Sequence, residues 1–299
     1  MKSDAPEFEI VEPPVDEEPQ PLPPMAANQQ QASDSEQPEG AIAEEESEQF
    51  EDSEPASQAA GPALALNVGA RFGTRAFQYS DPMPGLRDYN LKVSPNLSLR
   101  VQWFPVAHFA GGVMSNFGLD LRGEMLVGVT SVNRTGQKFS TSAASFGVGL
   151  RARLPLEPVE LGAIVGYGRH SFALEETSLS DPDVPDVGYG FLRTGLDFRV
   201  QLDPVWLQAQ AAYLVGLSHG EIADAPWFPH TSGDGMELEV GIGYSLSSIL
   251  GLELTFAMQR YFMAFDPELD DPGVRGPRRV AGGAVDQYLS SRVGMVIRL

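Results

Sequence analysis

Between residues 62 and 299 this chain alternates apolar and polar residues in one segment after another, and this alternation constrains the fold more than any other feature. From Leu91 to Trp103 the odd positions are apolar and the even positions between them are polar. Successive side chains of a β-strand point to opposite faces, so the pattern predicts strands with one apolar and one polar face. No segment follows the helical period over a convincing length, and we therefore predict an all-β fold.

The pattern recurs ten times, and the connections between the predicted strands alternate in length. The predicted strands cover approximately residues 63–77, 91–103, 113–130, 139–154, 159–174, 187–202, 205–218, 235–247, 250–265 and 284–299. Long polar connections follow the odd-numbered strands, at residues 78–90, 131–138, 175–186, 219–234 and 266–283. Tight turns such as Asp203-Pro204 follow the even-numbered strands, apart from a longer one at 105–112. Short turns at one end and long loops at the other predict a ten-stranded antiparallel up-and-down transmembrane β-barrel.

The polar face of the predicted strands carries many ions, whereas the apolar face is nearly free of them, which reverses the arrangement of a soluble barrel. We therefore predict that the apolar face contacts lipid and that the polar face encloses a lumen. The predicted network of lumen ion pairs comprises Arg71, Arg100, Asp120, Arg122, Glu124, Arg151, Arg153, Glu160, Arg193, Asp197, Arg199, Glu237, Glu239, Glu253, Arg292 and Arg298. Ten strands give a narrow barrel, so we expect Arg–carboxylate pairs to fill most of it.

Aromatic residues gather near the ends of the predicted strands. Three of them, Trp103, Phe104 and Trp206, lie near the short turns. Six more lie near the long loops: Phe77, Phe139, Phe172, Tyr189, Phe262 and Tyr288. Transmembrane barrels carry a ring of aromatic residues at each membrane interface, so we predict that these nine residues form two girdles.

Residues 1–61 differ from the rest of the chain in charge and composition. They hold 17 acidic residues, one Lys and nine Pro, with only Phe8 and Phe50 as aromatics. Such a segment buries too little apolar surface to offset its ordering entropy, so we predict a disordered acidic tail rich in Pro, Glu and Gln. The sequence from Met1 contains no apolar stretch of the kind found in a secretory signal, although the predicted barrel needs export.

Residues 62–299 resemble the Gram-negative outer-membrane β-barrel superfamily. The strongest local match is the alternating segment 289–299, although Leu299 stands where the family usually ends in an aromatic residue. The resemblance implies integral insertion in the outer membrane and contact with the lipid bilayer and lipopolysaccharide. It also implies that the barrel-assembly machinery reads the C-terminal strand. An even strand number places both termini in the periplasm, where the acidic tail is available to a periplasmic partner.

The overall composition excludes several classes of function. The chain of 299 residues has a formal net charge of −21, four His and no Cys. Nucleic acid is therefore not expected as a partner, because binding to phosphates needs a basic face. The absence of Cys excludes a disulfide scaffold, a thiolate zinc site and a cysteine nucleophile. We expect neither a cofactor nor a metal.

Two sets of residues are compatible with the active site of an outer-membrane hydrolase. Omptin-type proteases are ten-stranded and use an Asp pair and an Asp–His pair at the outer rim; Asp181 and Asp183, with His170 or His230, are the candidates. Lipid A deacylases use His-x-Ser, which His230-Thr231-Ser232 resembles, and Glu237 or Glu239 lies near enough in sequence to orient the His. Acidic loop segments at 181–183 and 266–271 could hold a divalent cation, but their spacing fits no calcium loop.

From these observations we predict a non-enzymatic outer-membrane barrel whose lumen is largely filled by ion pairs and whose long outer loops make surface contacts. A narrow porin-like channel for small solutes is the main alternative, because the surplus of inward Arg favours anions. A hydrolase of the protease or deacylase type is the third possibility.

Overall fold

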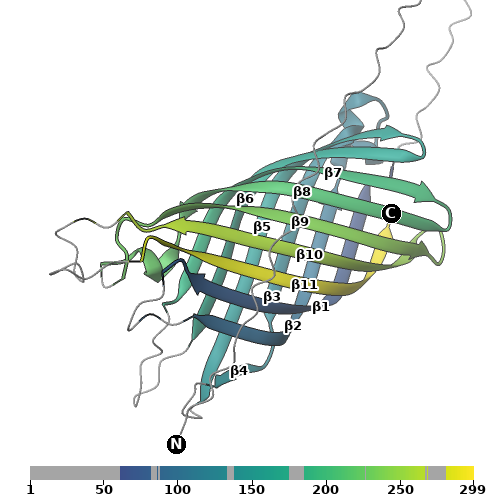
Figure 1. Cartoon of the computed structure of the whole chain (residues 1–299). Coiled ribbons are helices and arrows are strands. Elements are labelled where there is room, and N and C mark those ends of the chain that lie inside the picture. The colour runs from purple at the N-terminus through teal and green to yellow at the C-terminus, as the bar shows by residue number, and fades with distance from the viewer. Residues whose placement is uncertain are drawn as a thin grey trace, which may run out of the picture. The chain divides into compact units, whose positions relative to one another are not determined.

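In this computed structural model the described residues are 61–81, 86, 88–132, 138–174, 185–225, 227–266, 268 and 281–299. The predicted tail lies outside the described residues except for Gly61. Alternating residues form long strands in the described part (Figure 1). Their bounds are β1 Leu64–Tyr79, β2 Tyr89–Trp103, β3 Phe117–Leu126, β4 Val129–Val132, β5 Lys138–Leu156, β6 Val159–Leu174, β7 Val187–Leu202, β8 Val205–Ser218, β9 Ser232–Ser245, β10 Leu250–Ala264 and β11 Gly283–Arg298.

The strands form one closed antiparallel sheet. Consecutive strands pair with each other except β3 and β4, β1 pairs with β11, and β3 pairs with β5, which closes the ring. The short β4 pairs with β5 beyond β3, so β3 and β4 together form one interrupted wall strand. The interruption falls at Gly128, whose φ of 64° is one that glycine adopts readily. The prediction of a ten-stranded antiparallel barrel is therefore confirmed.

Apolar side chains cover the outer surface of this barrel. Val93 is 69% exposed and Leu196 is 68% exposed, whereas Asp120 on the opposite face of the wall is 2% exposed. A water-soluble barrel would bury its apolar side chains, so this distribution requires a lipid environment. Among the described residues no helix has the length and hydropathy needed to span a bilayer.

The start of the first strand and the end of the last strand meet at the short-turn end of the barrel, which we call the turn end. The main-chain groups of Leu64 and Leu299 exchange two hydrogen bonds, at 2.9 and 2.8 Å. The C-terminus lies at this end in Figure 1. We call the opposite end, from which the long connections leave, the loop end.

Three local features depart from the alternation. Residues 113–116, predicted as the start of a strand, form the 3-10 helix η2 (Val113–Asn116), which follows η1 (Pro105–His108). At the loop end, Gly220–Ala223 forms a third 3-10 helix, η3. Its Gly220 has φ of 77° and lies so close to the main chain of β7 that an added Cβ would be 2.3 Å from a main-chain nitrogen there.

A shift in strand register changes one predicted face. The pairing of β1 with β2 is irregular between Gly73 and Arg75. Beyond this point Leu91, predicted to face lipid, packs instead against the buried cluster inside the barrel. A bulge inserts an extra residue, and a one-residue shift turns every following side chain to the other face.

Candidate functional site: the barrel lumen

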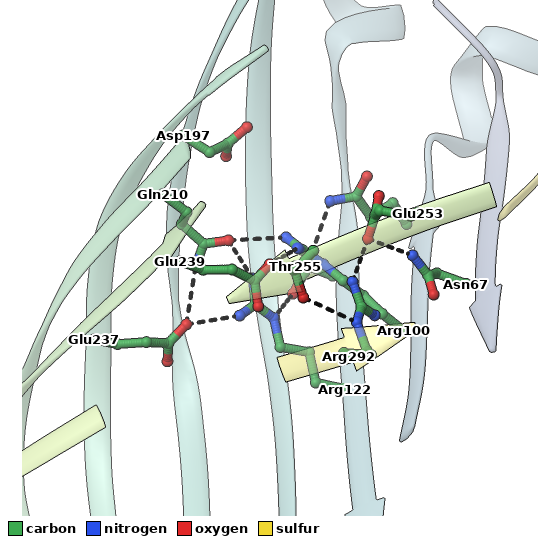
Figure 2. Close-up of polar contacts among 12 residues, drawn as sticks. Asn67, Arg100, Arg122, Asp197, Gln210, Glu237, Glu239, Glu253, Thr255 and Arg292 are labelled. Atoms are coloured by element: carbon green, nitrogen blue, oxygen red, sulfur yellow. Dashed lines mark hydrogen bonds and ion pairs between the residues drawn. The ribbon is translucent and has the colours of Figure 1, made fainter. Parts of the chain in front are cut away.

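The middle of the lumen is crossed by an ion-pair network that joins opposite walls (Figure 2). Arg122 on β3 donates to Asp120 Oδ1 at 2.6 Å and to Glu237 Oε1 of β9 at 3.1 Å. Arg100 on β2 donates from Nε to Asp120 Oδ2 at 3.0 Å. Gln210 Oε1 on β8 accepts hydrogen bonds from Arg100 at 3.2 Å and Arg122 at 3.0 Å. Because β3 lies opposite β8 and β9 in the closed ring, these contacts span the bore.

Two more Arg side chains thicken this layer. Arg71 lies between Glu124 and Glu239, with its Nε 3.1 Å from Glu124 Oε1 and its Nη2 3.3 Å from Glu239 Oε2. Arg193 on β7 donates to Glu237 Oε1 at 2.8 Å. Each guanidinium meets at least one carboxylate, which offsets part of the cost of removing both groups from bulk water. We call these residues, with Arg100, Asp120, Arg122 and Gln210, the central network.

Further ion pairs lie closer to the turn end. Arg292 on β11 pairs with Glu253 on β10. Arg151 on β5 pairs with Glu160 on β6 at 3.0 Å and also with Asp197 on β7. These pairs join strands that are adjacent or one strand apart, so they line the wall rather than cross the bore.

Arg153 belongs to the predicted ion-pair network but makes different contacts. Its guanidinium donates to the main-chain oxygens of Pro62 at 2.8 Å and Gly61 at 3.0 Å. Its Cζ lies 3.7 Å from the centre of the Phe104 ring. Arg153 thus holds the chain segment that leads into β1, and its assignment to an ion pair is wrong.

Arg199 and Arg298 are the other two exceptions in the predicted network. Neither has an ion pair or a hydrogen bond through its side chain among the described residues. Both guanidiniums lie at the ring of Trp206 instead, with Cζ 5.2 Å from the ring centre for Arg199 and 4.0 Å for Arg298. Strand phase predicts that a side chain points inward, but it does not predict which partner lies at the same level.

At the loop end the lumen holds a buried ion pair that joins the first and last strands. Arg75 on β1 donates to Asp286 on β11 through Nε at 2.9 Å and through Nη2 at 2.8 Å. The hydroxyls of Tyr189 and Tyr288 donate to Asp286 Oδ2 at 2.8 and 2.9 Å. The Arg75 Cζ also lies 4.0 Å from the centre of the Phe172 ring.

Asp286 was missed by the sequence analysis, as were Asn67 and Gln210. Asp286 lies in the polar phase of its strand, two residues before Tyr288, so the phase itself carried the signal. Asn67 donates to Glu253 Oε1 at 2.8 Å and Gln210 Nε2 donates to Glu237 Oε1 at 3.1 Å. These amides supply hydrogen bonds that a count of charged residues alone does not predict.

An apolar cluster occupies the lumen at the loop end, near the pair of Arg75 and Asp286. Its buried members are Phe77, Phe172, Leu174, Val187, Tyr189, Phe191, Ala212, Leu214, Ile222, Phe228, Tyr261, Met263, Phe265, Ala281 and Ala284. The rings of Tyr189 and Tyr261 stack at 3.8 Å, and those of Phe228 and Phe265 stack at 3.9 Å. We call this set the mouth cluster.

The predicted lipid-facing girdles are wrong for most of their members. Only Trp103, 42% exposed, and Phe262, 41% exposed, point away from the barrel. Six of the nine are buried: Phe77, Phe104, Phe139, Phe172, Tyr189 and Trp206. Tyr288 packs against the mouth cluster. Six of these seven occupy the inward phase of their strands, and Phe104 directly follows β2. Strand phase decides the face of a side chain even near the strand end.

A segment from the loop after β8 completes the mouth cluster. This mouth segment comprises residues 219–225 and 227–231. The main-chain NH of Gly188 donates to the His219 oxygen at 3.0 Å, and that of Ile222 donates to the Asp186 oxygen at 3.3 Å. Ile222 is fully buried and Phe228 is 7% exposed. Burial lowers the pKa of His219 below its usual value of 6.5, against smaller opposing effects of the Gly233 carbonyl and Asp234.

Cavities remain along the bore between described residues. A cavity of about 150 Å³ lies between the mouth cluster and the central network, and its lining includes Arg71, Ser94, His170 and Ser290. A smaller one of about 50 Å³ lies on the turn-end side of the central network, and its lining includes Arg199.

Three candidate hydrolytic residues, His170, His230 and Ser232, lie in the described part of the chain. His170 lies on the inner wall with its ring 4.5 Å from that of Tyr288, and its Nε2 has no hydrogen-bond partner among the described residues. The His230 Nε2 is 3.9 Å from Glu268 Oε2 at the loop end. Ser232 is the first residue of β9.

The remaining acidic candidates are only partly described. Asp181, Asp183, Asp270 and Asp271 lie outside the described residues. Within the part of the chain that the structure describes, no three His, Asp or Glu side chains gather as metal ligands. Glu237 and Glu239, considered as partners for a catalytic His, bind Arg side chains of the central network.

The closed ring of long strands, the apolar outer surface and the charged interior define the class of this protein. It is an integral outer-membrane β-barrel, and its location is the outer membrane.

Comparisons with known proteins agree in architecture only. The solved structures that resemble the chain include the outer membrane protease OmpT from Escherichia coli, with 11% identity and a TM-score of 0.45, covering 79% of this chain and 96% of that one. Neisserial surface protein A has 10% identity and a TM-score of 0.34, covering 79% of this chain and 97% of that one. The similar structures also include the attachment invasion locus protein Ail of Yersinia pestis in complex with the heparin analogue sucrose octasulfate. It has 8% identity and a TM-score of 0.34, covering 79% of this chain and 97% of that one. No protein-family model matches the chain. A search of curated proteins also gave no match. Because one fold hosts many functions, the activities in these names are not transferred.

Proposed function

We propose that this protein is a non-enzymatic, non-conducting outer-membrane barrel whose long outer loops present a surface for contact. The observation that carries this proposal is that side chains occupy the bore at two successive levels. The central network joins opposite walls, and the mouth cluster fills the loop end. Side chains at two levels favour a bore without a continuous aqueous path, so the functional surface is expected outside it.

The energetics of the central network support a lasting closure. Removing one partner of a buried ion pair costs about 3–5 kcal/mol, and each 1.4 kcal/mol is about a tenfold change in population. The carboxylates that span the bore, Asp120 and Glu237, each meet two Arg side chains. Thermal opening of this layer is therefore expected to be rare.

The membrane and the periplasm supply the expected partners. The apolar outer wall fits lipid chains, and the outer loops fit contact with lipopolysaccharide. The C-terminal strand β11 fits recognition by the barrel-assembly machinery. The acidic segment 1–61 is proposed to bind a partner in the periplasm.

A narrow channel is the second candidate, and one observation favours it. The cavities of about 150 and 50 Å³ lie on either side of the central network, so displacement of a few side chains would connect them. The unpaired Arg199 and Arg298 at the turn end would then favour anions.

Single-channel recording in planar bilayers separates the two candidates. The closed barrel predicts no current steps above those of a bilayer that received detergent alone. Reproducible unitary steps with a reversal potential that favours anions would contradict closure and establish the channel. Unboiled protein that migrates differently from boiled protein on a detergent gel verifies that the barrel is folded in the same samples.

A further inference from the structure

The surplus positive charge of the lumen is concentrated at the turn end, on Arg199 of β7 and Arg298 of β11. Seven other inward Arg side chains meet a carboxylate: Arg71, Arg75, Arg100, Arg122, Arg151, Arg193 and Arg292. Within the described part of the chain, Arg199 and Arg298 have no such partner. The Nε atoms of both residues and Nη2 of Arg298 are buried and make no hydrogen bond with a described residue.

The wall around these two Arg is shaped by Trp206. This indole is fully buried and lies against Gly243 of β9 and Gly251 of β10. A Cβ added to Gly243 would be 2.0 Å from the indole, and one added to Gly251 would be 2.6 Å from it. The two glycines therefore leave space for the indole of Trp206, on β8, to extend over β9 and β10 toward β11. The ring in turn fixes the positions of both guanidiniums.

The carboxylates nearby do not neutralise this pair. Glu160 and Glu253 act on both Arg199 and Arg298 from beyond ion-pair distance. Glu160 is held by Arg151, and Glu253 is held by Arg292. Two guanidiniums at one aromatic ring, each partly buried and without a carboxylate partner among the described residues, favour the uptake of an anion.

We propose that Arg199 and Arg298 form a binding site for a small inorganic oxyanion, of the phosphate type, at the turn end of the lumen. The planar guanidinium presents several N–H donors and suits the oxygens of such an anion. The cavity of about 50 Å³ beside this pair is lined by Arg199 but not by Arg298, and it has room for a few waters or one small ion. Four carboxylates also line it, and each of them meets an Arg outside the pair: Glu160, Asp197, Glu239 and Glu253. The site needs no conducting bore, because it lies on the periplasmic side of the central network.

Trp206 provides a built-in reporter of this site. In a variant that carries Trp103→Phe and Trp227→Phe, Trp206 is the only Trp of the chain. We expect sodium phosphate to change its emission in a saturable way, and sodium chloride of equal ionic strength to produce no saturable change. The measurement uses the full chain folded in a neutral detergent.

Substitutions then assign the response to the two Arg. Adding Arg199→Gln and Arg298→Gln is expected to weaken phosphate binding at least about tenfold, because charge-assisted hydrogen bonds are lost. Arg260→Gln is the matched control, since Arg260 lies over the outward-facing Phe262; it is expected to leave binding unchanged. Arg199→Lys and Arg298→Lys keep the charge and are expected to retain weaker, saturable binding.

Three results would overturn the proposal. One is a linear response to phosphate that chloride reproduces at equal ionic strength, which is measured without any Arg variant. Another is equal affinity in the double Gln variant, with folding verified by heat-modifiable migration. The third is equal weakening by Arg260→Gln, which would indicate a general effect of charge rather than a site.

Discussion

Arg75 and Asp286 are separated by 211 positions in the sequence, yet they form a two-pronged ion pair that ties β1 to β11 inside the barrel. Arg75 is 2% exposed and Asp286 is fully buried. The pair lies where the first and last strands meet, so it forms only when the ring of strands has closed. The hydroxyls of Tyr189 and Tyr288 supply two further hydrogen bonds to the same carboxylate.

Asp286→Asn is expected to destabilise the folded barrel by about 3–5 kcal/mol, because it leaves the Arg75 guanidinium buried without its counter-charge. Urea titration of the protein refolded in lipid vesicles measures this change. Asp203→Asn is the matched control, since Asp203 is exposed in a short turn, and it is expected to change stability by less than about 0.5 kcal/mol. Equal effects of the two substitutions would contradict the role assigned to the pair.

A Cβ at residue 243 is expected to displace Trp206, since it would lie 2.0 Å from the indole. Gly243→Ala should therefore cost about 1–3 kcal/mol through overpacking and shift the emission of Trp206. Gly123→Ala is the control, because nothing lies within 4 Å of its added Cβ. The same urea titration and emission spectra serve for both variants. An unshifted Trp206 in Gly243→Ala would contradict the packing described here.

Closure at two levels predicts that no single level controls conduction. Ile222→Ala with Phe228→Ala loosens the mouth cluster, and Glu237→Gln with Glu239→Gln removes carboxylates from the central network. We expect neither pair alone to produce current steps in planar bilayers. All four substitutions together are expected to produce a small anion-favouring conductance. Conduction by either pair alone would show that the bore has a single barrier.

Acidification is expected to release the mouth segment. The pKa of His219 is lowered by burial, so the folded segment binds fewer protons than a released one. Its stability is therefore complete above the ordinary His pKa of about 6.5 and falls as the pH drops below that value. Emission of Trp227, in a variant carrying Trp103→Phe and Trp206→Phe, reports this release. His219→Gln should abolish the pH dependence near 6.5, and an unchanged profile would assign the transition to another group.

The alternation in the sequence was sufficient to predict the barrel, because its apolar and polar phases persist over strands of 10 to 19 residues. It also placed most of the charged lumen side chains on the correct face. The girdle prediction was wrong because it relied on how near a residue lies to the strand end and not on its phase in the alternation. Phe172 and Tyr189 lie near strand ends, as girdle residues do, but their phase directs them inward.

Other features of the lumen depend on contacts that no local pattern contains. The pairing of Arg75 with Asp286 requires strand register across the closure of the barrel. The contact of Arg298 with Trp206 depends on glycines in two intervening strands. Within the mouth segment, Gly220–Ala223 form the 3-10 helix η3 against β7 because Gly220 permits a close approach. The sequence there has no alternation from which this could be predicted.

The central claim is that the apolar flank of the wall contacts lipid while the opposite flank is enclosed, and quenching by lipids brominated on their acyl chains tests it most directly. Two single-Trp variants are compared in vesicles: one keeps Trp103, which is 42% exposed on the outer wall, and the other keeps Trp206, which is fully buried inside. We predict strong quenching of Trp103 and none of Trp206. Quenching of Trp206 comparable to that of Trp103, or an unquenched Trp103, would contradict the account.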